Sequence, residues 1–230
     1  GRAFVPRAMA EFGEAAVAGM AIVARLTPVA FGVIFALSGA VGPIIGQNAG
    51  AGEGARVRRA YLDALIFTAV VVIPISLLLF LLRDPIVALF DAEGVTVQLV
   101  FLFCGPLALA FFFNGMLFVS NAAFNNLGHP FTSTLLNWGR HTIGTILPVI
   151  LFAGLFGATG VLIGQAVGGV AFGLLSLWLV RRVVGREMGS QVATHREVQP
   201  QGGGVYRFHT PRRGRLEGFG SRHAQEGPII

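Results

Sequence analysis

The sequence contains no lysine and only one cysteine, and both shortages limit what the chain can be. All 17 basic residues are therefore arginines. The single Cys104 lies in an apolar run, where it can form neither an internal disulfide nor a two-cysteine metal or redox site. Charged residues make up 12% of the 230 residues, hydrophobic residues make up 54%, and the mean hydropathy is +0.72. Soluble domains carry about twice this share of charge, so the composition predicts an integral membrane protein.

Several chemical motifs are also missing from the sequence. The chain opens on no signal-peptide pattern, and the predicted spans contain no Ser/His/Asp set, metal-ligand cluster or carboxylate pair. We therefore predict that the protein is not an enzyme and needs no cofactor or metal. The glycine-rich stretch at 50–54 lacks the GxxxxGK[ST] pattern and follows an apolar helix, so we interpret it as a helix C-cap and turn.

Five apolar runs are long enough to cross a hydrocarbon core of about 30 Å as helices. Hydrocarbon cannot hydrogen-bond a peptide group, so such runs must satisfy their backbone internally. We predict spans at about 15–47, 61–82, 97–124, 132–156 and 161–180, which together form an all-α helical lobe over residues 15–184. Residues 1–14 are expected to be a leader on the extracellular or periplasmic side, the remainder of a truncated loop. Residues 185–230 are polar and basic, which predicts a disordered tail.

The placement of the arginines predicts an orientation. The link between the first two spans carries Arg56, Arg58 and Arg59, whereas the next link is mainly acidic and the tail begins with arginines again. Because arginine collects on the cytoplasmic side, we expect the first link and the C-terminus in the cytoplasm. The net charge of +6 follows this pattern and does not indicate nucleic-acid binding.

Side chains in the third predicted span are the candidates for a substrate or ion cavity. Asn114 lies mid-span beside Phe111 and Phe112, and Asn121 lies on nearly the same helical face. An amide in lipid costs free energy unless it faces a cavity or a partner helix. Asn114 could offer its carbonyl to a cation beside aromatic surface, or it could hydrogen-bond to a neighbouring helix. The sequence favours neither interpretation.

Other polar and small residues have simpler interpretations. Arg25, Arg140 and His141 lie close enough to span ends to extend toward water. His141 could also titrate in a proton-coupled cycle. Glycines at four-residue spacing in the fifth span, such as Gly164 and Gly168, predict close packing against another helix.

The order of the motifs resembles the multidrug and toxic compound extrusion (MATE) transporters, over about residues 13–182. The resemblance is carried by Ala24-Arg25, Gly46 to Gly52, Arg56 to Ala60, Ala122 to Pro130, Asn137, Pro148, and Gly157 to Val161. In the turn after the first span, the matching residues are Gln47, Asn48, Gly50, Gly52, Arg56 and Arg59.

The resemblance implies the C-terminal lobe of a twelve-helix antiporter in a bacterial inner membrane. Such an antiporter would export organic cations or other amphipathic drugs in exchange for sodium or protons, with its N-terminal lobe missing from this chain. This sequence departs from sodium-coupled NorM-type members, because Asn114 stands where they carry an acidic residue. An amide cannot carry a proton, so the resemblance leaves Asn114 as a cavity-lining or cation-contact position. The alternatives are a non-transporting membrane scaffold or assembly subunit, and a lipid-precursor flippase.

Overall fold

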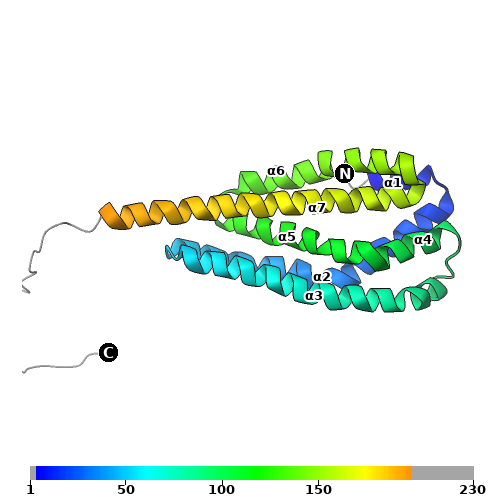
Figure 1. Cartoon of the computed structure of the whole chain (residues 1–230), viewed down its shortest axis with the longest axis horizontal. Helices are drawn as coiled ribbons and strands as arrows, with labels where there is room; N and C mark the ends of the chain where they lie inside the picture. The colour runs from blue at the N-terminus through cyan, green and yellow to red at the C-terminus, as the bar shows by residue number, and fades with distance from the viewer. Residues whose placement is uncertain (1–3, 198–230) are drawn as a thin grey trace, which may run out of the picture.

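The described chain is a bundle of long helices that run back and forth along one axis (Figure 1). A computed structural model describes residues 4–197, with side chains as far as residue 185. Its elements are α1 (Phe4–Ala10), α2 (Glu14–Gly50), α3 (Gly54–Leu89), α4 (Val95–Leu102), the π-helical segment η1 (Phe103–Leu107), α5 (Ala108–Asn126), α6 (Pro130–His141) and α7 (Ile143–Glu197). No strand occurs within residues 4–197, which confirms the predicted all-α fold.

Four helical stretches within the described residues are long and apolar enough to cross a membrane. They are Glu14–Gly50, Gly54–Leu89, Val95–Asn126 and Pro130–Gly185. In the most apolar window of α3 only 28% of the residues are buried, and in α2 the side chain of Val29 is 84% exposed. An apolar surface of this extent would be unfavourable in water, and it suits the hydrocarbon of a bilayer.

The fourth stretch folds back on itself at Gly157, whose φ of 63° and ψ of −137° interrupt the helix of α7. The two arms of α7 then pack antiparallel, with Gly160 against Phe152, Gly164 against Pro148, and Gly168 against Gly144. The predicted spans 132–156 and 161–180 therefore both lie in this stretch. The contacts at Gly164 and Gly168 agree with the close packing expected from their spacing.

The third stretch is interrupted near its middle. Gly105 has φ −95° and ψ −115°, outside the helical region, and Pro106 follows it inside η1. Proline supplies no N–H to the helix ladder, and π-type turns commonly accompany such a break. In contrast, α2 continues as one helix through Pro28 and Pro43. The third stretch is thus bent at a defined position between α4 and α5.

Two apolar cores hold the bundle together. One contains Phe31, Leu99 and Cys104, and the other contains Ile45 and Phe124, all of them fully buried. Helix α5 lies between α2, α3 and α7, and small residues allow this proximity. A Cβ at Gly115 of α5, for example, would come within 3.0 Å of Ile34 in α2.

Three boundaries differ from the sequence prediction. The expected leader at 1–14 contains the helix α1, whose Val5 and Met9 are buried against the bundle. Helix α3 continues to Leu89, past the predicted end at 82. Helix α7 continues to Glu197, whereas disorder was predicted from 185. The rest of the predicted tail lies outside the described residues.

Candidate functional site

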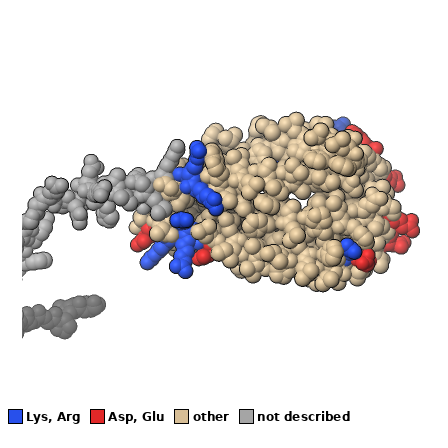
Figure 2. Space-filling view, in the orientation of Figure 1, with Lys and Arg blue, Asp and Glu red and all other residues tan. Residues whose placement is uncertain are grey.

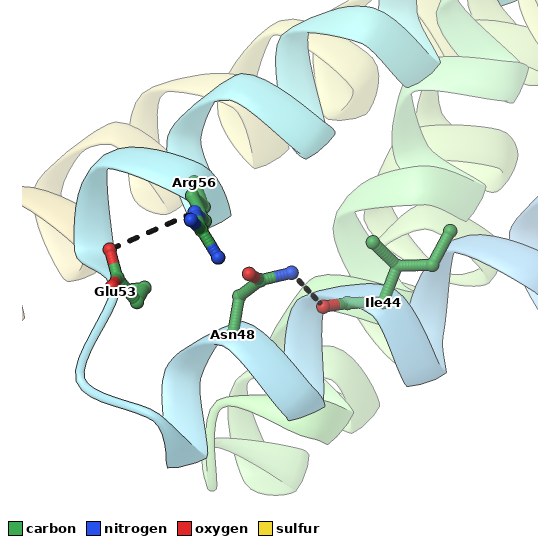
Figure 3. A network of polar contacts seen from close by, with 4 residues as sticks. All are labelled: Ile44, Asn48, Glu53 and Arg56. Atoms are coloured by element: carbon green, nitrogen blue, oxygen red, sulfur yellow. Dashed lines mark hydrogen bonds and ion pairs between the residues drawn. The ribbon is translucent and has the colours of Figure 1, made fainter.

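The turn between α2 and α3 ends the first long helix in a defined capping motif. The Glu53 N–H donates to the Asn48 carbonyl over 2.9 Å, and the Gly52 N–H donates to the Ala49 carbonyl over 3.0 Å. Gly52 has φ +73°, the left-handed conformation that this Schellman arrangement requires. Figure 3 shows the Asn48 amide donating back to the Ile44 carbonyl over 2.7 Å. The glycine-rich stretch is therefore a C-cap, as its sequence predicted.

The remaining residues of the family motif lie at this turn and point mainly to solvent. Gln47 and Gly50 are exposed at the end of α2. Arg56 pairs with Glu53 at 3.9 Å between Nε and Oε2 (Figure 3), and Arg59 pairs with Asp63 at 3.8 Å. Exposed pairs of this kind contribute little to stability, typically 0–1 kcal/mol. The structure brings these residues together at one end of the bundle, away from the apolar middle.

Charges gather at the two ends of the bundle, and the broad surface between them is uncharged in Figure 2. The arginine end, formed by the α2–α3 turn and part of α7, carries Arg56, Arg58, Arg59, Arg181 and Arg182. The acidic end, formed by the α1–α2 and α3–α4 connections and the adjoining helix ends, carries five acidic residues, Glu11, Glu14, Asp84, Asp91 and Glu93, and two arginines, Arg7 and Arg83. This distribution has the form that the positive-inside rule describes.

Asn114 does not stand alone in α5, because its carbonyl oxygen accepts a hydrogen bond from the Nη2 of Arg140 in α6. The arginine is partly buried, and Thr145 donates to its backbone carbonyl over 2.7 Å. That bond satisfies a carbonyl at the break between α6 and α7, where Thr142 has non-helical dihedrals. Arg140 was expected to extend toward water, whereas its guanidinium is held against Asn114 inside the bundle.

Arg140 also lines a cavity of about 520 Å³ between α1, α2, α6 and α7. Its lining residues are Val5, Pro6, Met9, Val17, Met20, Ala21, Ala24, Arg140, His141, Thr145 and Gln165. The volume falls within the usual range for small-molecule sites. An apolar wall with a few polar groups is also typical of such sites. We call this space the Arg140 cavity.

Asn121 connects two helices. Its side-chain Nδ2 donates to the side-chain Oδ1 of Asn137 over 3.1 Å, and its own Oδ1 accepts from the Ser133 hydroxyl over 3.1 Å. Both partners belong to α6. These bonds match the helix-joining alternative for the amides of the third span, and they use both ends of the Asn121 side chain.

Phe111 and Phe112 pack against other rings. Phe111 stacks on Phe31 of α2, with ring centroids 4.1 Å apart and planes 10° apart, and it meets Phe35 edge-on at 6.2 Å. Phe112 meets the adjacent Phe113 at 5.5 Å. Stacking covers one face of the Phe111 ring, so that face cannot receive a cation.

Sequence reasoning missed Gln165, which lines the same cavity as Arg140. Its amide nitrogen is buried and has no hydrogen-bond partner among the described residues. Arg140 in α6 and Gln165 in the second arm of α7 lie 25 positions apart, so spacing alone could not bring them together. The signal present in the sequence was an arginine inside a predicted span, which marks a functional candidate by default.

Comparison with known proteins identifies the family. A family model described as MatE matches residues 4–150. This chain belongs to the MatE family. The MATE resemblance read from the sequence is thereby confirmed.

Two relatives illustrate how far the likeness extends. A Pseudomonas savastanoi protein named "Uncharacterized 21 kDa protein in iaaL 5'region" is 37% identical over 180 residues, which cover 73% of this chain and 55% of that protein. A Shewanella oneidensis protein named "FAD transporter" is 25% identical over 175 residues, which cover 76% of this chain and 39% of that protein.

A solved structure shows the same fold. The bent form of the Vibrio cholerae MATE transporter VcmN superposes with a TM-score of 0.75 at 23% identity. The match covers 81% of this chain and 42% of that one. The chain is thus an integral membrane helix bundle with a MATE-type fold, and it spans about half the length, or less, of these proteins.

Proposed function

We propose that this chain forms the C-terminal lobe of a MATE-type secondary antiporter. The transporter would export small organic cations or other amphipathic compounds in exchange for sodium ions or protons. The observation that carries the proposal is the structural match, which covers most of this chain but less than half of a solved transporter. A unit of that size corresponds to one of two repeated lobes, between which secondary transporters bind their cargo.

The described residues support a binding role within this lobe. The Arg140 cavity opens among four helical segments, and the Asn114–Arg140 bond joins α5 to the same region. The break at Gly105 and Pro106 bends the third stretch, and interrupted helices of this kind recur in lobes that rock to alternate access. The name of the Shewanella relative extends the candidate substrates from cations to a phosphate-bearing compound.

The charge distribution supports an orientation. With the arginine end in the cytoplasm, the C-terminus is cytoplasmic and the acidic end faces the periplasm of a bacterial inner membrane. Both ends then lie in water or headgroups, and the uncharged surface between them meets lipid. The proposed partners are the bilayer, the transported compound and the N-terminal lobe of the same transporter.

Transport is tested on the full-length gene product that contains this chain. Expressed in cells that lack their own efflux pumps, it should lower accumulation of ethidium or of an anionic fluorescent dye. Monensin should abolish the effect if sodium drives export, and a protonophore should abolish it if protons do. Unchanged accumulation of both dyes, with the protein present in the membrane, would refute the proposal.

Replacing Asn114 separates transport from a scaffold role. In a transporter, Asn114→Leu should remove efflux and keep the protein assembled, because the amide holds Arg140 at the cavity. In a scaffold, the same change should alter assembly, with no efflux to lose. Asn125→Leu is the matched control, since Asn125 is exposed on the same helix.

A further inference from the structure

The Arg140 cavity has a polar end and an apolar wall. Its wall is formed by methionine, valine and alanine side chains from α1 and α2, such as Met9 and Met20. Its polar end is formed by Arg140, His141, Thr145 and Gln165 from α6 and α7. No aspartate or glutamate is among its lining residues in the described part of the chain. A compound that fits both parts must carry a polar head on an apolar body.

The positive charge at the polar end has no negative partner in the part of the chain that the structure describes. None of the three ion pairs there includes Arg140, whose one hydrogen-bond acceptor is the neutral amide of Asn114. A guanidinium carries five N–H donors and does not lose its proton in proteins. Charges away from water are normally paired, so Arg140 has capacity for an anion.

Gln165 adds a second donor in need of an acceptor. Its Nε2 is buried without a partner, although buried polar groups in proteins are nearly always hydrogen-bonded. Gln165 lies on the second arm of α7, opposite the segment that carries Arg140. Both groups line the same cavity, and both supply N–H donors, which oxyanions accept.

A cation fits this cavity poorly. It would approach a guanidinium in a space where no described lining residue is a carboxylate, and like charges repel. Phe111 offers no compensation, because it is not among the residues that line the cavity and one face of its ring is covered by Phe31. The charge of the cavity therefore selects against the usual organic cation.

We infer that the Arg140 cavity binds the oxyanion head, a carboxylate or phosphate, of an amphipathic compound whose apolar body lies along α1 and α2. Arg140 and Gln165 donate to the oxygens, and Asn114 positions the guanidinium. That the bound compound is cargo rests on the proposed transport function, whereas the binding itself does not.

Binding is measured on the full-length gene product that contains this chain, in nanodiscs of phosphatidylcholine. The probe is a dansyl-labelled undecanoate, and the competitors are dodecyl phosphate and dodecyltrimethylammonium, which share the same tail and are compared at equal concentration in the bilayer. Dodecyl phosphate should displace the probe at a concentration at least tenfold lower. Equal potency of the two competitors would overturn the inference.

Variants locate the site. Arg140→Met should weaken dodecyl phosphate binding about 10- to 100-fold, the usual effect of losing a hydrogen bond to a charged group, and should not weaken cation binding. Arg140→Lys should lose less, because it keeps the charge. Arg25→Met is the matched control, since Arg25 also lies in an apolar helix but lines no described cavity. If Arg140→Met and Arg25→Met bind alike, the anion does not occupy this cavity.

Gln165→Glu is a second variant that tests the same site if Arg140→Met does not fold. The new carboxylate would sit in the cavity as a built-in partner for Arg140, so anion binding should fall and cation binding should not. Unchanged anion binding in a folded Gln165→Glu would overturn the inference.

Adding phosphatidylglycerol to the nanodiscs identifies the source of the head group. If this lipid competes with the probe, the bound head group is the phosphate of a bilayer lipid. If it does not compete, the bound compound is a soluble amphiphile. Because no transport is measured, failed dye export would count against the proposed function and leave this binding result standing.

Discussion

The antiparallel arms of α7 give a sharp prediction at Gly164. A Cβ there would lie 2.6 Å from the Val149 nitrogen and 2.7 Å from the Pro148 carbonyl oxygen. Both are backbone atoms that cannot rotate away, and ordinary contact begins at 3.4 Å. The arms would have to separate by about 0.8 Å to restore ordinary contact, and overpacking of this kind costs about 1–3 kcal/mol. The better helix propensity of alanine offsets about 0.5–1 kcal/mol, so Gly164→Ala should be destabilising.

Gly154→Ala is the control, because it lies in the same helix with nothing within 4 Å of its added Cβ. Alanine there should stabilise the helix by about 0.5–1 kcal/mol. The buried Cys104 is the single thiol of the chain, so a thiol-reactive fluorophore reports unfolding at one site. In detergent, Gly164→Ala should have the lower thermal midpoint. The two midpoints should differ by about 2–4 °C for each kcal/mol of difference in unfolding free energy. A midpoint for Gly164→Ala at or above that of Gly154→Ala would refute the close packing of the two arms.

Two further substitutions test local features with the same thiol assay. Asp91→Gly should raise the unfolding free energy by about 1 kcal/mol, because Asp91 has φ +46° after the end of α3, where glycine meets no steric penalty. A lower midpoint than the unsubstituted chain would contradict the left-handed conformation. Asn121→Leu should lower the unfolding free energy by about 1–3 kcal/mol, since it removes both bonds to α6 and leaves Ser133 and Asn137 without those partners. The exposed Asn125→Leu serves as its control and should change the midpoint little.

The long helices were predictable because the bilayer simplifies the problem. Where hydrocarbon surrounds a chain, an apolar run must be helical, and composition alone locates it. The turns were also readable, since Gly52 and Gly128 end α2 and α5 in the left-handed conformation that favours glycine. The fold-back at Gly157 lies within the expected link between the fourth and fifth spans.

The missed elements depend on tertiary contacts. Helix α1 has seven residues, too few to be stable alone, and it forms because Val5 and Met9 are buried by the bundle. The helix break at Thr142 is not marked at that residue by a glycine or proline, the residues that usually signal a break in a sequence. It is stabilised by the Thr145 hydroxyl bond to the Arg140 carbonyl, which no local pattern predicts.

The sequence predicted some residues of the candidate site but not their contacts, because the contacts also depend on tertiary packing. Polar residues in apolar spans could be picked out from composition, and Asn114 and Arg140 were both noticed. That they contact each other follows only from the packing of α5 on α6. The cavity requires four helical segments to meet, so its lining was beyond sequence reasoning.

Charge inside the bundle connects the site to the proposed cycle. Between the arginine end and the acidic end, the described spans carry two charged side chains, Arg25 and Arg140, and both are positive. Moving an unpaired charge through a low-dielectric region is costly, and across 100 mV each elementary charge adds about 2.3 kcal/mol. If the lobe works in the proposed transport cycle, an oxyanion bound at Arg140 would cancel that charge, and the loaded lobe would change orientation at lower cost than the empty one. A lobe with this property would couple its rocking to occupancy of the Arg140 cavity.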